Sequence, residues 1–143
     1  NYCTKVTDFS SCFRNCQALT SIPTGLFNYC TKVTDFSGCF YQCYALTSIP
    51  NNLFNNCTDV TNFSNCFRSC NNLALPAKIF NLTALQNKNP NMTQCFCADS
   101  TNYSPTGTIQ AIWSYVTNTN VSQCFYNCTG ISNYSSIPSN WIN

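Results

Sequence analysis

The chain has 143 residues, of which only 7% are charged, against roughly 25% in a typical soluble domain. It contains four Asp but no Glu and no His, so the usual residues of acid–base, metallohydrolase and triad catalysis are missing and we expect no enzyme. Six scattered Lys and Arg give a net charge of +2, a poor basis for binding nucleic acid, and nothing approaches the ~18 consecutive apolar residues of a membrane span.

The first 80 residues consist of three copies of one motif about 27 residues long. Residues 1–27 read NYCTKVTDFSSCFRNCQALTSIPTGLF, and residues 28–54 read NYCTKVTDFSGCFYQCYALTSIPNNLF. Residues 55–80 read NNCTDVTNFSNCFRSCNNLALPAKIF, which is one residue shorter. A fixed period of this length is typical of a solenoid, in which stacked coils bury a continuous core that one coil cannot bury alone.

Each repeat divides into two similar halves of 13 or 14 residues, V-T-x-F-S-x-C-F-x-x-C and L-T-S-I-P-x-x-L-F-x-x-C. The apolar tetrads are too short for helices and suit short strands or corners, and Pro23, Pro50 and Pro76 end the second tetrad. The segment after each tetrad suits one helical or 3-10 turn. We expect the Phe, Val, Leu and Cys positions to point inward. Six Phe are expected to stack as one ladder: Phe13, Phe27, Phe40, Phe54, Phe67 and Phe80.

The period weakens after residue 80. Residues 81–112 are interpreted as a divergent repeat and residues 113–143 as a capping repeat, because a terminal coil must present a wettable outer face. Within them, Gly107–Val116 has the apolar spacing of a short amphipathic helix. We predict one solenoid domain over residues 1–143 with about five coils, or alternatively a narrower solenoid with 13 or 14 residues per coil. Because Asn1 opens directly into a regular repeat, we expect a fragment of a longer protein or a chain that stacks on another molecule.

The repeat motifs resemble the BspA-like branch of the leucine-rich repeats. The segments LTSIP, VTDFSGCFYQC and SNYSSIPSNW carry the resemblance, with Phe9 and Cys12 where the V-T-D-M-S-x-M-F-x-x-C relatives have Met. The resemblance covers essentially the whole chain. It implies a leucine-rich-repeat-type solenoid of short strands and helical or 3-10 turns, located extracellularly on a bacterial surface or a phage virion.

The same resemblance implies a non-enzymatic binding module of the surface adhesin or phage receptor-binding type, with no cofactor. Its partner would be a host or bacterial surface glycan or protein. The alternative is a structural protein whose repeats associate end to end in a fibre or form part of a virion or extracellular assembly. Recognition is expected at registers, meaning equivalent positions of successive repeats, whose residue varies while the core positions stay constant. Two such registers are selected: Arg14, Tyr41 and Arg68; and Gln17, Tyr44 and Asn71.

The thirteen Cys allow three interpretations. They can be small core hydrophobes, because free Cys is among the most buried residue types. They can form disulfides between neighbouring coils, which lie ~4.8 Å apart, or across one turn at i and i+4, and the odd number leaves at least one thiol unpaired. A metal site is disfavoured, because Cys-x3-Cys differs from the usual Cys-x2-Cys and no His is present. The predicted structural cysteines are Cys3, Cys12, Cys16, Cys30, Cys39, Cys43, Cys57, Cys66, Cys70, Cys124 and Cys128.

Overall fold

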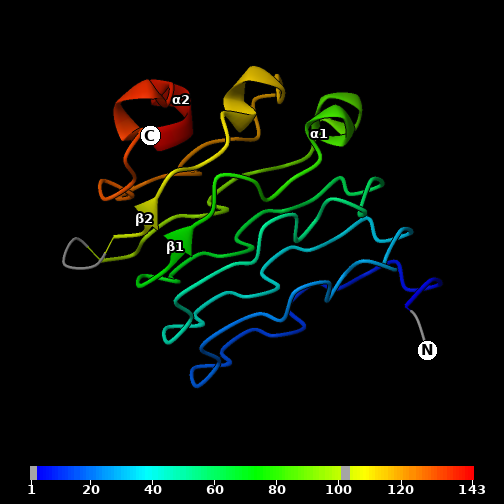
Figure 1. Ribbon diagram of the computed structural model, residues 1–143. Helices are drawn as coiled ribbons and strands as arrows, with labels where there is room; N and C mark the ends of the chain where they lie inside the picture. The colour runs from blue at the N-terminus through cyan, green and yellow to red at the C-terminus, as the bar shows by residue number, and fades with distance from the viewer. Residues whose placement is uncertain (1–2, 101–103) are drawn as a thin grey trace.

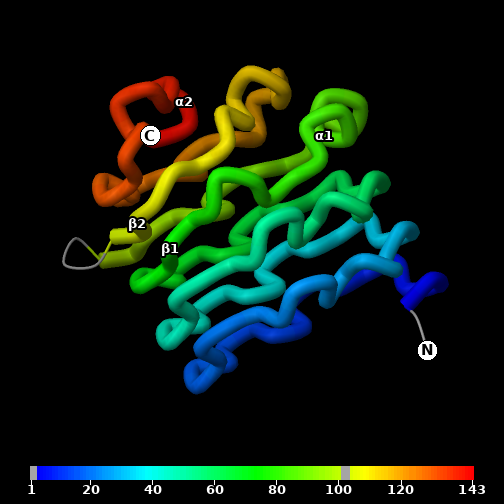
Figure 2. The backbone as a smooth tube through the Cα atoms, viewed as in Figure 1, coloured from blue at the N-terminus to red at the C-terminus, as the bar shows by residue number. Residues whose placement is uncertain are grey.

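The computed structural model describes residues 3–100 and 104–143, whose backbone winds through successive coils lying side by side (Figure 1, Figure 2). Parallel β-bridges join neighbouring coils. One series of bridges runs from Asp8 to Asp35, then to Asn62 and Asn91. Equivalent residues of the repeats therefore meet across the stack, although the leucine-rich-repeat class itself stays a prediction.

Regular strands are rare in this architecture. Among the described residues they are β1 (Ala74–Leu75) and β2 (Thr106–Gly107), which pair in parallel. The other tetrads make isolated bridges and not the short strands expected in every coil, because turns follow within a few residues. Bridged residues lie between 24 and 32 positions apart, which is the spacing of a full repeat and not of a half-repeat.

The later coils replace some turns by short helices. These are α1 (Leu82–Lys88), η1 (Ile112–Ser114), η2 (Tyr134–Ser136) and α2 (Ser139–Ile142). Helices α1 and η1 lie along the same side of the stack (Figure 1).

The amphipathic helix predicted over Gly107–Val116 is wrong, since only the residues of η1 within it are helical. Gly107 belongs to β2 and pairs with Leu75. Gln110 bonds to the preceding coil, its Oε1 accepting from the backbone N–H groups of Ile79 and Phe80 at 2.9 and 3.0 Å. These tertiary contacts hold most of the segment extended.

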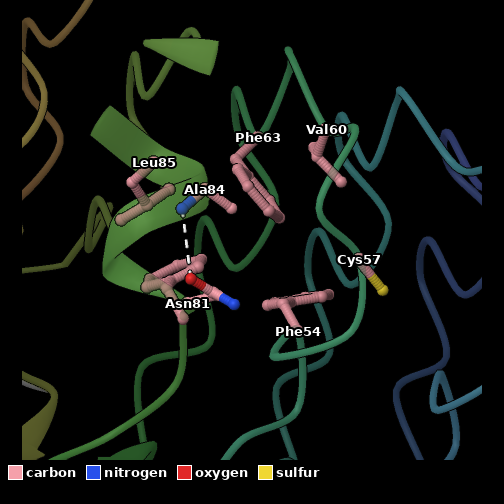
Figure 3. Close-up of a pocket in the computed structure, with 8 residues that line it drawn as sticks. Phe54, Cys57, Val60, Phe63, Asn81, Ala84 and Leu85 are labelled. Carbon is pink, nitrogen blue, oxygen red and sulfur yellow. Dashed lines mark hydrogen bonds between the residues drawn. The ribbon is translucent and has the colours of Figure 1, made fainter. Parts of the chain in front are cut away.

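Helix α1 is attached to the third coil through its N-cap. Asn81 Oδ1 accepts from the Ala84 N–H at 3.1 Å, and Asn81 Nδ2 donates to the Asn55 carbonyl at 3.3 Å. Ala84 and Leu85 of the helix line a small cavity together with Phe63 of the coil (Figure 3). The cavity between helix and coil measures about 10 Å³, roughly the space of one water molecule, so this contact is packing and not a ligand site.

The core is built from Phe ladders with one ring per coil. Successive rings stack with centroids 5.1 to 5.8 Å apart. The single six-ring ladder expected from the half-repeats is not formed, because a coil closes after a full repeat and the two halves supply separate ladders. The ladders are Phe9, Phe36 and Phe63; Phe13, Phe40, Phe67, Phe96 and Phe125; and Phe27, Phe54 and Phe80.

The two ends of the stack differ. At the C-terminal end Trp141 of α2 is 2% exposed and stacks on Phe125 at 6.1 Å, and its carbonyl accepts the Phe125 N–H at 2.9 Å. On the first coil, by contrast, apolar positions expected to point inward are uncovered: Leu26 is 37% exposed, whereas Leu53 of the second coil is 3% exposed. The inward orientation therefore gives burial only where a neighbouring coil covers the side chain.

Candidate functional site

A polar groove of about 370 Å³ crosses the first three coils at equivalent turns. Each coil contributes the turn that follows its V-T-x-F segment. Because the same registers recur, the groove is lined by rows of hydroxyl, amide and guanidinium groups. Its residues are Ser11, Arg14, Ser37, Gly38, Tyr41, Ser64, Asn65 and Arg68.

Backbone hydrogen bonds hold the three long side chains of the groove in one row. The Asn15 N–H donates to the Tyr41 carbonyl at 2.8 Å, and the Gln42 N–H donates to the Arg68 carbonyl at 3.0 Å. These bonds set the first, second and third coils in register. Arg14 therefore stands beside Tyr41, and Tyr41 beside Arg68.

Two guanidinium groups lie over the Tyr41 ring. The Arg14 Cζ lies 4.8 Å from the ring centroid and the Arg68 Cζ lies 5.8 Å from it, and the two Arg come from the coils on either side. The ring therefore orients the two cations, which occupy space over the ring that a stacked sugar would need.

The two Arg differ in their partners. Arg68 forms an ion pair with Asp99 at 3.1 Å, and its Nη1 donates to Gln94 Oε1 at 2.6 Å and to Asn65 Oδ1 at 3.4 Å. Arg14 takes part in neither of the two ion pairs found among the described residues, and its side chain lies at the exposed edge of the groove. The donors of Arg68 are thus occupied, whereas the Arg14 guanidinium keeps its charge uncompensated.

The second predicted register does not line the groove. Its residues follow the first register by three positions. The Gln17 N–H donates to the Asn15 carbonyl at 2.8 Å, the Tyr44 side chain is 39% exposed, and Asn71 Oδ1 is buried with no hydrogen-bond partner. The structure thus brings Arg14, Tyr41 and Arg68 together and leaves Gln17, Tyr44 and Asn71 outside.

Sequence reasoning missed the short residues of the groove. Ser11, Gly38 and Asn65 occupy one register and vary between repeats, as the selected registers do. That variation was a usable signal. Small residues at such a position are also typical of an ordinary turn, so the variation alone does not point to a binding surface.

None of the thirteen cysteines forms a disulfide in the structure. Cys43 Sγ donates to the Phe13 carbonyl and Cys70 Sγ donates to the Phe40 carbonyl, both at 3.1 Å, so each thiol bonds to the preceding coil. Burial raises the pKa of the Cys57 thiol to about 12, which keeps it protonated and poorly nucleophilic. These contacts are those of packing residues, and disulfide formation stays a prediction.

Within residues 3–100 and 104–143, no group of three His, Cys, Asp or Glu is placed to hold a metal ion. Nor does any helix in these ranges have the length and apolar character needed to cross a membrane. In the comparisons with known proteins, no family model, no curated protein and no solved structure matches the chain. The function is therefore inferred from the groove and from the repeat motifs.

Proposed function

We propose that the protein is a non-enzymatic binding module that recognises a saccharide through the groove. The observation that carries this proposal is the exposed Arg14 guanidinium, which has no carboxylate partner among the described residues and is oriented by Tyr41 within a row of hydroxyl groups. A charged side chain that the fold already holds in place loses less conformational entropy when a ligand binds, so it binds the ligand more tightly.

The lining of the groove favours a saccharide over a protein partner. Protein interfaces depend on aromatic or aliphatic anchors that fill desolvated pockets. Here the only aromatic ring, Tyr41, is enclosed by two Arg, and the short lining groups are hydroxyls and an amide such as Ser37, Ser64 and Asn65. Such groups match the dense donors and acceptors of a sugar. From the motif resemblance we also propose a location on a bacterial surface or a phage virion.

One observation favours the structural alternative as a second candidate. The apolar end of the first coil is exposed, and a cavity of about 160 Å³ there is lined by Phe13, Leu19 and Leu26 among others. End-to-end growth would require a complementary face at the other end, which α2 covers through Trp141. Sedimentation velocity between about 1 and 100 µM tests this candidate, which requires a mass that rises with concentration.

Immobilised saccharides titrated with the purified protein test the proposed binding. We expect Arg14→Ala to weaken binding about tenfold or more, since a hydrogen bond to a charged group contributes roughly 1.5–3 kcal/mol. Lys78→Ala is the matched control, because it removes the same charge from an exposed position outside the groove. The proposal is rejected if no saccharide binds, or if the two variants bind a saccharide equally well.

A further inference from the structure

Gly38 occupies a register where every other coil carries a side chain. The backbone there is left-handed in all five coils, with φ 58° at Gly38 and 55°, 56°, 54° and 53° at Ser11, Asn65, Gln94 and Gln123. Because four residues with side chains adopt this conformation, the turn does not require glycine. The effect of glycine at this position is the missing side chain itself.

The surroundings of Gly38 would accept a side chain. A Cβ at this position would lie 3.4 Å from Ser11 Oγ and 3.9 Å from Tyr41 Cβ, which are ordinary contacts. Glycine is therefore not needed to relieve crowding. The absent side chain leaves a gap in the groove lining, bordered by Ser11 and by the Cβ atom of Tyr41.

In the later coils, the side chains at this position are linked, either directly or through Arg68. Arg68 Nη1 donates to Asn65 Oδ1 and to Gln94 Oε1, and Gln94 Nε2 donates to Gln123 Oε1 at 2.6 Å. The row of amides stops at Asn65, because Gly38 contributes no group. The gap thus has polar walls, while the residue at its centre supplies no polar side chain of its own.

The charge beside the gap is positive. Arg14 lines the groove, and its guanidinium has no ion-pair partner within residues 3–100 and 104–143. The carboxylates of Asp8 and Asp35 accept the N–H groups of Ser10 and Ser37, each at 2.6 Å, and neither Asp lines the groove. The planar guanidinium presents paired donors that match the two oxygens of an oxyanion.

We propose that the gap at Gly38 is a subsite for the acidic group of a saccharide, a uronate carboxylate or a sulfate ester. Arg14 binds the oxyanion with two parallel N–H donors, and the hydroxyls of Ser11 and Ser37 bond to the adjoining sugar. Gly38 determines specificity by leaving room for the acidic sugar. This inference rests on the proposed saccharide binding and names the ligand class of the same groove.

Binding to matched acidic and neutral polymers tests this subsite. The probes are polygalacturonate against its methyl ester, and dextran sulfate against dextran, measured by biolayer interferometry. We expect one acidic member to bind about tenfold or more above its neutral counterpart, and the responding pair identifies a carboxylate or a sulfate as the ligand group.

Filling the gap tests the role of Gly38. Gly38→Asn introduces the residue that the third coil carries at this register. We expect this substitution to lower the affinity for the acidic polymer about tenfold or more. The far-ultraviolet circular dichroism should stay unchanged, which shows that the variant folds. The matched control is Gly25→Asn, which lies outside the groove in another left-handed turn, with φ 79°, where the second coil carries Asn52. This control is expected to bind as the unmodified protein does.

The possible results separate the two proposals. Equal binding of acidic and neutral polymers, or an unchanged affinity in Gly38→Asn, overturns the acidic subsite and leaves saccharide binding intact. Binding of polyglutamate but of none of the saccharides overturns both, in favour of an acidic protein partner. Absence of binding to any probe also overturns both.

Discussion

Replacing Phe54 by Ala removes a ring from the centre of the core. The Phe54 side chain is 1% exposed and stacks between Phe27 and Phe80, with centroids 5.7 and 5.6 Å away. It also contacts Phe36 and Phe63 at 4.8 and 5.0 Å in tilted arrangements. The void left by Ala cannot close easily, because the Phe54 N–H is bonded to the Ile79 carbonyl at 3.1 Å and holds the coils at their spacing.

The expected cost follows from burial and from the lost ring contacts. Truncation of a buried Phe to Ala costs about 3–5 kcal/mol, and each aromatic pair contributes about 0.5–1.5 kcal/mol beyond buried area. Since these contributions are not fully additive, we expect a loss of about 4–6 kcal/mol. The total stability of a chain of this length is on the order of 7–21 kcal/mol, so the variant loses a large share of it.

Phe13→Ala is the matched control for this prediction. Its ring is only half-buried on the uncovered first coil and, among the described residues, stacks on Phe40 at 5.1 Å, so we expect a loss of about 1–2 kcal/mol. Urea unfolding measures the loss of stability in both variants, followed by circular dichroism and by the fluorescence of Trp113 and Trp141. If the two signals change at different urea concentrations, single coils unfold independently. Equal losses in the two variants would refute the stacking argument.

Two further predictions concern the thiols. In the folded, reduced protein, Ellman's reagent should modify the exposed Cys3, Cys12 and Cys16 readily and the ten buried Cys only after unfolding; a native count near thirteen would contradict the packing. The pH dependence follows from burial, which raises the pKa of Cys30 to about 11 and of Cys57 to about 12, while unfolded thiols titrate near 8.5. The stability due to each protonated thiol is therefore complete below about pH 8. As pH rises from about 8.5 towards 12, the Cys57 thiol lowers the free energy of unfolding by about 1.4 kcal/mol per pH unit, and the Cys30 thiol acts in the same direction. Urea titrations at pH 7 and 10 measure this loss, and a flat profile would contradict it.

The position of the groove could be anticipated only in part. The variation at Arg14, Tyr41 and Arg68 against constant core positions is visible in the aligned repeats. The contact of the Tyr41 ring with two guanidinium groups is not, because each Arg lies 27 residues away in sequence and reaches the ring only across the stack. For the same reason the structure was needed to show that Asp99 pairs with Arg68, and that Arg14 has no ion-pair partner among the described residues.

The sequence by itself determines the repeat period, the apolar positions and the near-absence of charge, because these are properties of composition and order along the chain. Because the two half-repeats are similar, the sequence allows a coil of either one half-repeat or one full repeat. The β-bridges join residues that are a full repeat apart, so a coil is one full repeat. The apolar spacing of Gly107–Val116 suits a helix, yet pairing of β2 with β1 prevails over that local preference. Only the tertiary structure decides which residues become neighbours, because those contacts join separate coils and local propensity carries no information about them.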